Sequence, residues 1–141
     1  MATVFSRIVA GELPARFVWS DDRVVAFLSV NPLAPGHTLV VPREEVDQWV
    51  DASPELFARV TAVAHAVGDA VRAVWAPPRV GLLVAGFEVP HLHVHVFPAA
   101  GMGAFDFANA AREVDAAEQD AHAEALRGAL KRAGHGAAVP G

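Results

Sequence analysis

Segment 89–98 constrains this chain most, because it alternates three histidines with apolar residues and contains prolines at positions 90 and 98. Successive side chains of a β-strand point to opposite faces, so the pattern predicts a strand with three imidazole rings on one face: His91, His93 and His95. The residues between them form an apolar second face: Leu92, Val94 and Val96. Same-face neighbours lie about 6.6 Å apart in a strand. This spacing suits the binding of one phosphate group or one metal ion.

Two chemistries fit this row of histidines. In the first, the imidazoles hold a zinc ion that keeps a water molecule at its open position. In the second, one imidazole is a nucleophile and its neighbours transfer protons, because a group with a pKa near 6.5 takes either role at neutral pH. The chain has no cysteine, which excludes disulfides, thiolate catalysis and cysteine-based zinc sites. The spacing alone leaves both chemistries open.

The composition indicates one folded domain. The chain has 141 residues, of which 53% are hydrophobic and 19% charged, so it is long and apolar enough to bury a core. A net charge of -5 gives no general electrostatic reason to bind nucleic acid or an anionic membrane. No apolar span of about 20 residues occurs, and the N-terminus lacks the pattern of a signal peptide. We therefore expect a soluble, cytoplasmic protein with neither a nucleic-acid nor a membrane partner.

The order of the predicted elements indicates an α+β fold. Helices are predicted over residues 3–10, from the N-cap Ser53 to the Pro77-Pro78 pair, and from the N-cap Asp115 to about Ala133. Strands are predicted over residues 17–19, 24–28, 37–41, 80–85 and 89–98, with 80–85 fully buried. We expect a mostly antiparallel sheet of about five strands with one long helix and a C-terminal helix. Residues 1–134 form the single predicted domain, 99–103 a flexible loop, and 135–141 a disordered tail.

The four histidines outside the row divide into two groups. His37 follows the rigid loop 31–36, which contains two prolines and a glycine, and such a fixed point suits a functional side chain. His65 lies on the polar face of the long predicted helix. We expect His65, His122 and His135 to be solvated side chains, so His37 alone joins the row as a candidate.

The histidine row and three further segments resemble the histidine triad (HIT) superfamily, in particular its Hint- and Fhit-like members. Residues 90–98 match the signature His-φ-His-φ-His-φ-φ, in which φ is an apolar residue. Segment 4–15 resembles the family's opening helix and Ile-Pro-Ala turn, segment 21–27 its first hairpin, and segment 31–42 its upstream histidine segment. The resemblance covers about residues 3–100 in the expected order.

The resemblance implies a hydrolase or transferase that cleaves a nucleotide conjugate at its α-phosphate. By this resemblance, His93 is the nucleophile and forms a nucleotidyl-histidine intermediate that water then hydrolyses. His95 contacts the phosphate and assists the leaving group, His91 supports the nucleophile, and His37 is the family's fourth histidine. The family needs no metal or other cofactor in this scheme. It typically forms a homodimer through a shared sheet.

The resemblance also implies a substrate-binding set, in which this chain departs from the family pattern. The residues that match the nucleobase pocket and its surroundings are Phe5, Ile8, Phe27, Ser29, Asn31 and Leu39. Ser29 stands where the Hint branch of the family usually has an aspartate that binds ribose hydroxyls. Before the row of histidines, the slots of an asparagine, a glutamine and a small polar residue are taken by Val80, Phe87 and Glu88. An acid in that place repels a phosphate group unless it points away or is paired.

Two further substitutions concern a zinc site that some relatives have. Glu44-Glu45 replaces a common lysine-histidine pair, and Ser6 replaces a frequent cysteine. With those ligands absent, we do not expect that zinc site here.

The sequence thus gives one leading hypothesis and two alternatives. The leading hypothesis is a HIT-type nucleotidyl hydrolase whose substrate is a purine nucleoside phosphoramidate or a related, AMP-like conjugate. The first alternative is a nucleotide-binding or regulatory HIT module with weak turnover, which the altered segment before the histidines motivates. The second is a tri-histidine zinc hydrolase, for which bound metal and chelator-sensitive activity would be decisive.

Overall fold

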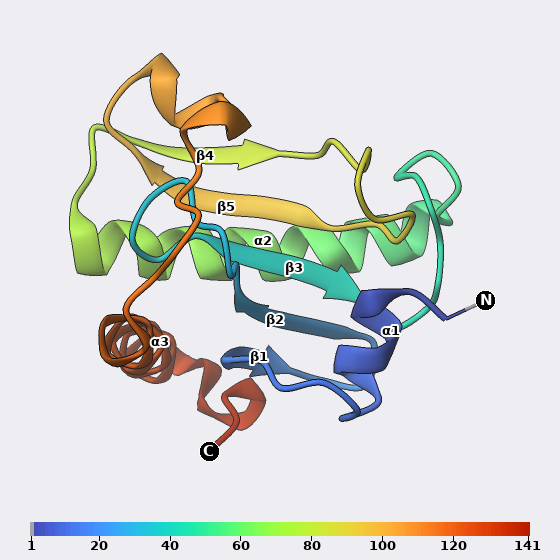
Figure 1. Cartoon of the computed structure of the whole chain (residues 1–141). Helices are drawn as coiled ribbons and strands as arrows, with labels where there is room; N and C mark the ends of the chain where they lie inside the picture. The colour runs from blue at the N-terminus through green and yellow to red at the C-terminus, as the bar shows by residue number, and fades with distance from the viewer. Residues whose placement is uncertain (1) are drawn as a thin grey trace.

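The computed structural model describes residues 2–141 as one five-stranded sheet flanked by helices (Figure 1). In chain order the main elements are α1 (Val4–Val9), β1 (Phe17–Ser20), β2 (Val24–Leu28), β3 (Thr38–Pro42), α2 (Pro54–Trp75), β4 (Arg79–Leu83), β5 (Val94–Ala99) and α3 (Ala116–Leu130). The strand order is β1-β2-β3-β5-β4, and every neighbouring pair is antiparallel. The predicted α+β fold is confirmed.

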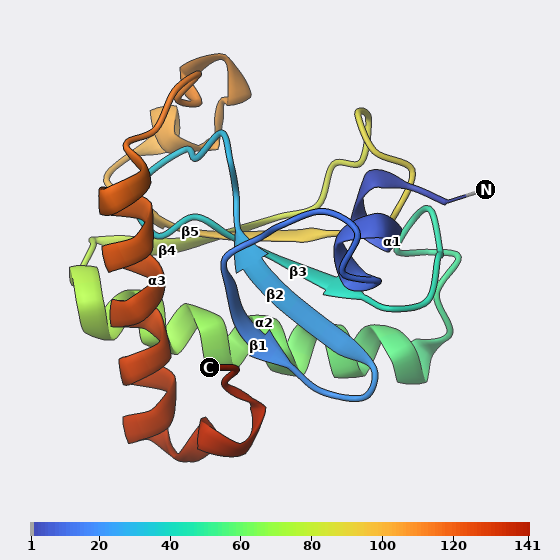
Figure 2. The ribbon, with the colours of Figure 1, turned by 60° about the horizontal axis from the view of Figure 1, so that its bottom comes forward.

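The two faces of the sheet have different partners. Helix α2 crosses one face and packs with α3 and the sheet into the main core, whereas α1 lies on the other face (Figures 1 and 2). Side chains alternate between these faces along β2 and β3, as the strand geometry requires. Val24, Ala26 and Val40 join the main core, and Phe27 and Leu39 join a smaller cluster around Phe5 of α1.

The helix starts follow the capping signals in the sequence. Ser53 accepts a hydrogen bond from the backbone N–H of Leu56, and Asp115 accepts one from Glu118, so both predicted N-caps are confirmed. Thr3 caps α1 in the same way. Within residues 2–141, none of the helices has the length and apolar character needed to cross a membrane.

The predicted strand over 89–98 is wrong at its beginning. Strand β5 starts at Val94, so His91 and His93 lie in an irregular segment before it. Two local contacts replace the ladder there: the N–H of His91 donates to the carbonyl of Val89, and the Nδ1 atom of His93 bonds the carbonyl of His91. The alternation nevertheless persists, since Leu92 joins the main core with Val94 and Val96.

The structure differs from the sequence-based expectation at three other places. Strand β4 is not fully buried, because it is the edge of the sheet, and Leu82 is 56% exposed. The stretch expected as a flexible loop runs into two short 3-10 helices, Met102–Phe105 and Phe107–Asn109. The stretch predicted to be a disordered tail forms a turn over Gly136–Ala138, and Val139 packs against the main core.

The loop before β3 is fixed to α2 at Gly36. Gly36 has φ +87°, a backbone conformation that side chains with a Cβ rarely adopt, and a Cβ built there overlaps the indole ring of Trp75. Gly11 has a similar φ of +82°, but a Cβ there meets no atom within 4 Å. Substitution of Gly11 would therefore introduce backbone strain alone, whereas substitution of Gly36 would add steric overlap with Trp75.

We predict that Gly36→Ala lowers the free energy of unfolding by about 2–4 kcal/mol, from left-handed strain plus overpacking. The matched control Gly11→Ala loses about 1 kcal/mol, from strain alone. Urea denaturation of both variants checks this, and equal losses would contradict the packing of Trp75 on the loop.

Candidate active site

Four histidines gather on the sheet face opposite α2. All are buried, with exposures of 1% for His37, 0% for His91, 7% for His93 and 6% for His95. The ring centroids of His93 and His95 lie 4.9 Å apart, and those of His37 and His95 lie 5.1 Å apart. The pairing of β3 with β5 sets Leu39 opposite His95, which brings the loop residue His37 to the same place.

One backbone donor determines which ring nitrogen carries the proton in His37 and, through His37, in His95. The N–H of Leu33 donates to Nδ1 of His37 at 2.9 Å, so a neutral His37 carries its proton on Nε2. That Nε2–H donates to Nδ1 of His95 at 2.9 Å. A neutral His95 therefore carries its proton on Nε2, which is buried and has no hydrogen-bond partner within residues 2–141. Such an unpaired buried donor is costly and is suited to an acceptor on a ligand.

A backbone carbonyl fixes the proton of His93 on the other ring nitrogen, Nδ1. Nδ1 of His93 donates to the carbonyl oxygen of His91 at 2.7 Å, so the lone pair of a neutral His93 is on Nε2. His91 is held in turn, since its Nε2 donates to the carbonyl of Pro42 at 2.8 Å. The site thus places an N–H donor of one ring beside a ring that has a free lone pair.

Burial keeps the rings of His37, His93 and His95 neutral at physiological pH. Burial, followed by the like charge of a protonated His93, lowers the pKa of His37 to about 4. Burial, followed by the like charges of His37 and His93, lowers the pKa of His95 to about 3. Burial also lowers the pKa of His93, against the opposing effects of its hydrogen bond to His91 and of the nearby Glu88 carboxylate. Neutral rings leave the lone pair of His93 available for attack.

An apolar wall adjoins the histidines on the α1 side. The ring of Phe5 meets that of His93 edge-on at 4.8 Å and that of Phe27 at 5.7 Å. Leu39 and Ile8 belong to the same cluster. The structure therefore brings together the four apolar residues that the resemblance assigned to a nucleobase pocket.

The other predicted substrate-binding residues lie elsewhere or are otherwise engaged. Phe87 is 98% exposed, so its ring packs against no other part of the chain, and Glu88 is also exposed. The hydroxyl of Ser29 accepts the N–H of Asn31, and the side-chain amide of Asn31 donates to the carbonyl of Ala111 at 3.1 Å. Both side chains thereby help to shape the chain around the loop that leads to His37.

Sequence reasoning missed residues that contact the histidines from distant segments. Phe107, on a 3-10 helix, lies 5.0 Å from the ring of His95. The hydroxyl of Thr3 lies 2.8 Å from Nδ1 of His91. No local pattern marks Phe107, whereas Thr3 carries an N-cap signal that says nothing of His91. His122 was also wrongly expected to be solvated, because it is half-buried and its ring lies 5.6 Å from that of Trp75.

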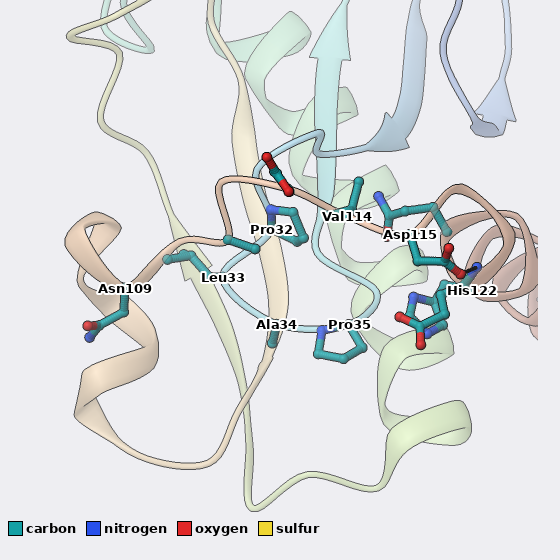
Figure 3. Close-up of a pocket in the computed structure, with 12 residues that line it drawn as sticks. Pro32, Leu33, Ala34, Pro35, Asn109, Val114, Asp115 and His122 are labelled. Atoms are coloured by element: carbon teal, nitrogen blue, oxygen red, sulfur yellow. Dashed lines mark hydrogen bonds between the residues drawn. The ribbon is translucent and has the colours of Figure 1, made fainter.

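A separate hollow of about 300 Å³ lies between the loop 32–35 and the start of α3 (Figure 3). Three carboxylates line it, those of Glu113, Asp115 and Glu118, and its lining includes no lysine or arginine. A phosphate group would be repelled there. The hollow is therefore unsuited to the ligand that fits the buried histidines.

The geometry does not favour the zinc alternative. Within residues 2–141, no group of three or more histidine, aspartate or glutamate side chains is arranged to hold a metal ion. Two of the imidazole nitrogens in the row bond backbone carbonyls instead, those of His91 and His93.

The lowered pKa values predict that stability falls as pH drops. In the unfolded chain the histidines take up a proton near pH 6.5, whereas in the folded chain His37 does so near 4 and His95 near 3. The unfolded state therefore binds more protons between these values, and the stabilisation present above pH 6.5 is lost as pH falls toward 4.

We expect urea titrations to show a falling free energy of unfolding from pH 7 to pH 5. This slope is proportional to the number of protons taken up on unfolding, and His95→Gln should lower that number by about one. His65→Gln, a change at an exposed histidine, is the control and should leave the slope as it is. An unchanged slope in His95→Gln would contradict a neutral, buried His95.

Comparisons with known proteins agree with this geometry. The family model described as HIT domain matches residues 10–102. An uncharacterized HIT-like protein from Borreliella burgdorferi is 34% identical over 111 residues, which are 74% of this chain and 80% of that protein.

Solved structures extend the similarity to the fold. A zinc-bound histidine triad family protein from Mycobacterium smegmatis has a TM-score of 0.80 at 27% identity, covering 94% of this chain and 96% of its own. A hypothetical histidine triad nucleotide-binding protein from Sulfolobus tokodaii has a TM-score of 0.81 at 25% identity, covering 91% of each chain. Another similar structure is described as a HIT family hydrolase. With its fold, its buried histidines and these similarities, the chain belongs to the HIT domain family, a family with nucleotide-binding and hydrolase members.

Proposed function

We propose that this protein hydrolyses a nucleotide conjugate, such as a purine nucleoside phosphoramidate, at its α-phosphate through a nucleotidyl-histidine intermediate. The observation that carries the proposal is the pairing of two neighbouring rings. His93 has its lone pair on Nε2, and His95 has an unpartnered, buried Nε2–H. A nucleophile beside a hydrogen-bond donor, which stabilises the charge on the departing atom, suits a displacement with a poor leaving group.

The first step forms the intermediate. Nε2 of His93 attacks the α-phosphorus and the bond from phosphorus to the leaving group breaks. The departing atom accepts a hydrogen bond from Nε2–H of His95 and takes a proton from solvent. The carbonyl of His91 keeps the Nδ1–H of His93 in place as the ring gains positive charge. The backbone N–H of Leu33 and the ring of His37 hold His95 in the tautomer that has its proton on Nε2.

The second step restores the enzyme. A water molecule attacks the phosphorus and loses a proton to solvent, and the bond between phosphorus and His93 breaks to release the nucleoside monophosphate. Each ring then has its starting protonation state. Splitting one displacement into two steps in this way lowers the barrier of each.

The nucleoside end of the substrate fits the apolar wall. Phe5 lies against both His93 and Phe27, so a base stacked there would bring its α-phosphate close to the nucleophile. Ile8 and Leu39 extend the wall. We assign base binding to these four side chains.

A nucleotide-binding module with weak turnover is the second candidate. It is favoured by the segment before the histidines, where Phe87 points into solvent and Glu88 is an exposed acid. Binding of AMP without measurable hydrolysis of any nucleotide conjugate would support this reading over the enzymatic one.

We predict that His93→Ala lowers the release of AMP from adenosine 5′-phosphoramidate at least about a thousandfold, because the nucleophile is lost. His65→Ala, at an exposed position of α2, is the control and should retain wild-type turnover. Undiminished turnover in His93→Ala would overturn the proposal.

A second experiment distinguishes the role of His95 from that of His93. His95→Ala, which removes the N–H donor, should slow conjugates with an amine leaving group far more than those with a fluoride or nitrophenolate leaving group, which are stable as anions. Equal slowing of both substrate classes would contradict the role of His95 as hydrogen-bond donor to the leaving group.

We also propose a homodimer through the edge strand β4. Leu82 on this strand is 56% exposed. A hollow of about 230 Å³ between α2 and β4 is lined by Val80, Leu82 and Val96 together with polar side chains such as those of Asp69 and Arg72. An unpaired, partly apolar edge favours pairing with a second copy of the same chain.

Leu82→Lys should therefore convert a dimer into a monomer, as measured by light scattering after size-exclusion chromatography. Val50→Lys is the matched control, because Val50 is 64% exposed but lies outside the sheet. A wild-type monomer, or a Leu82→Lys dimer, would count against the edge contact.

A further inference from the structure

A hydrogen-bonded cluster joins the N-terminus of α1 to the histidine segment. It contains Thr3 and Ser6 of the α1 start, Glu45 after β3, and His91. Oε1 of Glu45 accepts the N–H of Thr3 at 3.1 Å and the hydroxyl of Ser6 through a short contact. The hydroxyl of Thr3 lies 3.0 Å from that of Ser6 and 2.8 Å from Nδ1 of His91. Three separate parts of the chain therefore meet at one imidazole ring.

The direction of each hydrogen bond follows from the backbone. Nε2 of His91 donates to the carbonyl of Pro42, so Nδ1 of a neutral ring is an acceptor. The hydroxyl of Thr3 then donates to His91, and the hydroxyl of Ser6 donates to Glu45. Every hydroxyl proton has an acceptor in this arrangement.

The same atoms also satisfy a ring that carries two protons. Nδ1–H of His91 would then donate to the hydroxyl oxygen of Thr3, Thr3 to that of Ser6, and Ser6 to the Glu45 carboxylate. Only the hydroxyl of Thr3 reverses direction, and the carboxylate becomes the counter-charge at the end of the chain. The donors from Ser6 and Thr3 lower the pKa of the Glu45 carboxyl, so it stays ionised.

N-capping accounts for only part of this cluster. A capping Thr3 needs its oxygen to accept the N–H of Ser6, which it does at 3.0 Å. Capping does not require the hydroxyl of Thr3 to reach His91, nor Ser6 to bond Glu45. Those contacts hold the side chain of His91, the residue whose backbone carbonyl accepts the hydrogen bond from Nδ1 of His93 at 2.7 Å.

We propose that Glu45 is a positioning residue for the nucleophile, acting through Ser6, Thr3 and His91 to fix the carbonyl that holds the proton of His93. This inference rests on the proposed function for its kinetic consequences. Its structural content, the effect of Glu45 on the ring of His93, is independent of turnover. Hydrogen-bonded groups behind a reacting group commonly set its orientation and tautomer.

The test compares Glu45→Gln with Glu44→Gln in the full chain. Glutamine keeps the size of the side chain and an acceptor oxygen but removes the charge, and Glu44 is an exposed neighbour outside the cluster. Glu45→Gln should lower kcat for adenosine 5′-phosphoramidate about tenfold, within the range for such supporting groups. KM should stay within about twofold, and Glu44→Gln should match the wild type in both constants.

A spectroscopic readout does not depend on activity. In protein with ¹⁵N-labelled histidine, the Nδ1–H of His93 should give a slowly exchanging imidazole signal that Glu45→Gln shifts or broadens and Glu44→Gln leaves in place. If wild-type protein hydrolyses no conjugate, the proposed function fails and this signal alone decides the role of Glu45. An unchanged signal in Glu45→Gln would overturn the inference whatever the activity.

Two Ser6 variants guard against a purely structural effect. Ser6→Thr keeps the hydroxyl and should restore most of the kcat that Ser6→Ala loses, and Ser6→Ala should add little to Glu45→Gln because both break the same chain of contacts. Additive losses, or a common fall in stability, kcat and affinity without rescue by Ser6→Thr, would assign the cluster to helix anchoring and overturn the inference.

Discussion

The site depends on the packing of Leu92, Val94 and Val96 against α2. These side chains are almost fully buried in the main core, and their alternation forces the histidines between them to the opposite face. A slip of β5 by one residue would bury imidazoles against α2 and expose the apolar row to the site. The core thus fixes the register of the histidines, and through the pairing of β3 with β5 it also fixes where His37 arrives.

Backbone groups then give each ring its own role. Leu33 provides the donor that fixes His37, and the carbonyls of His91 and Pro42 fix His93 and His91. Because the backbone positions are set by the sheet and by the loop packed on Trp75, the tautomers are set before any ligand arrives. Chemically identical side chains thereby become a donor at His95 and an acceptor at His93.

Local signals in the sequence predicted most of the fold and the centre of the site. Ser53 and Asp115 mark the starts of their helices as N-caps. The alternation of histidines predicts that they share one face, and they do so even before β5, where no strand forms. The features that could not be predicted from the sequence depend on contacts between residues far apart in the chain. The exposure of Leu82 follows from strand order, and the contact of Phe107 with His95 follows from how a later segment folds back. The link from Glu45 to His91 joins residues far apart in the chain and has no local pattern.

The electrostatics of the resting site indicate how it would select a substrate. Neutral histidines attract a phosphate less strongly than cationic side chains would. The carboxylate of Glu88, which only partly offsets the effect of burial on the lowered pKa of His93, adds negative potential nearby. The unpartnered Nε2–H of His95 and the apolar wall at Phe5 must therefore supply much of the affinity for a nucleotide conjugate. A site of this kind selects substrates by their nucleobase and by the stabilisation that their leaving group needs. A bare phosphate ester, which offers neither base nor amine, would gain little from it.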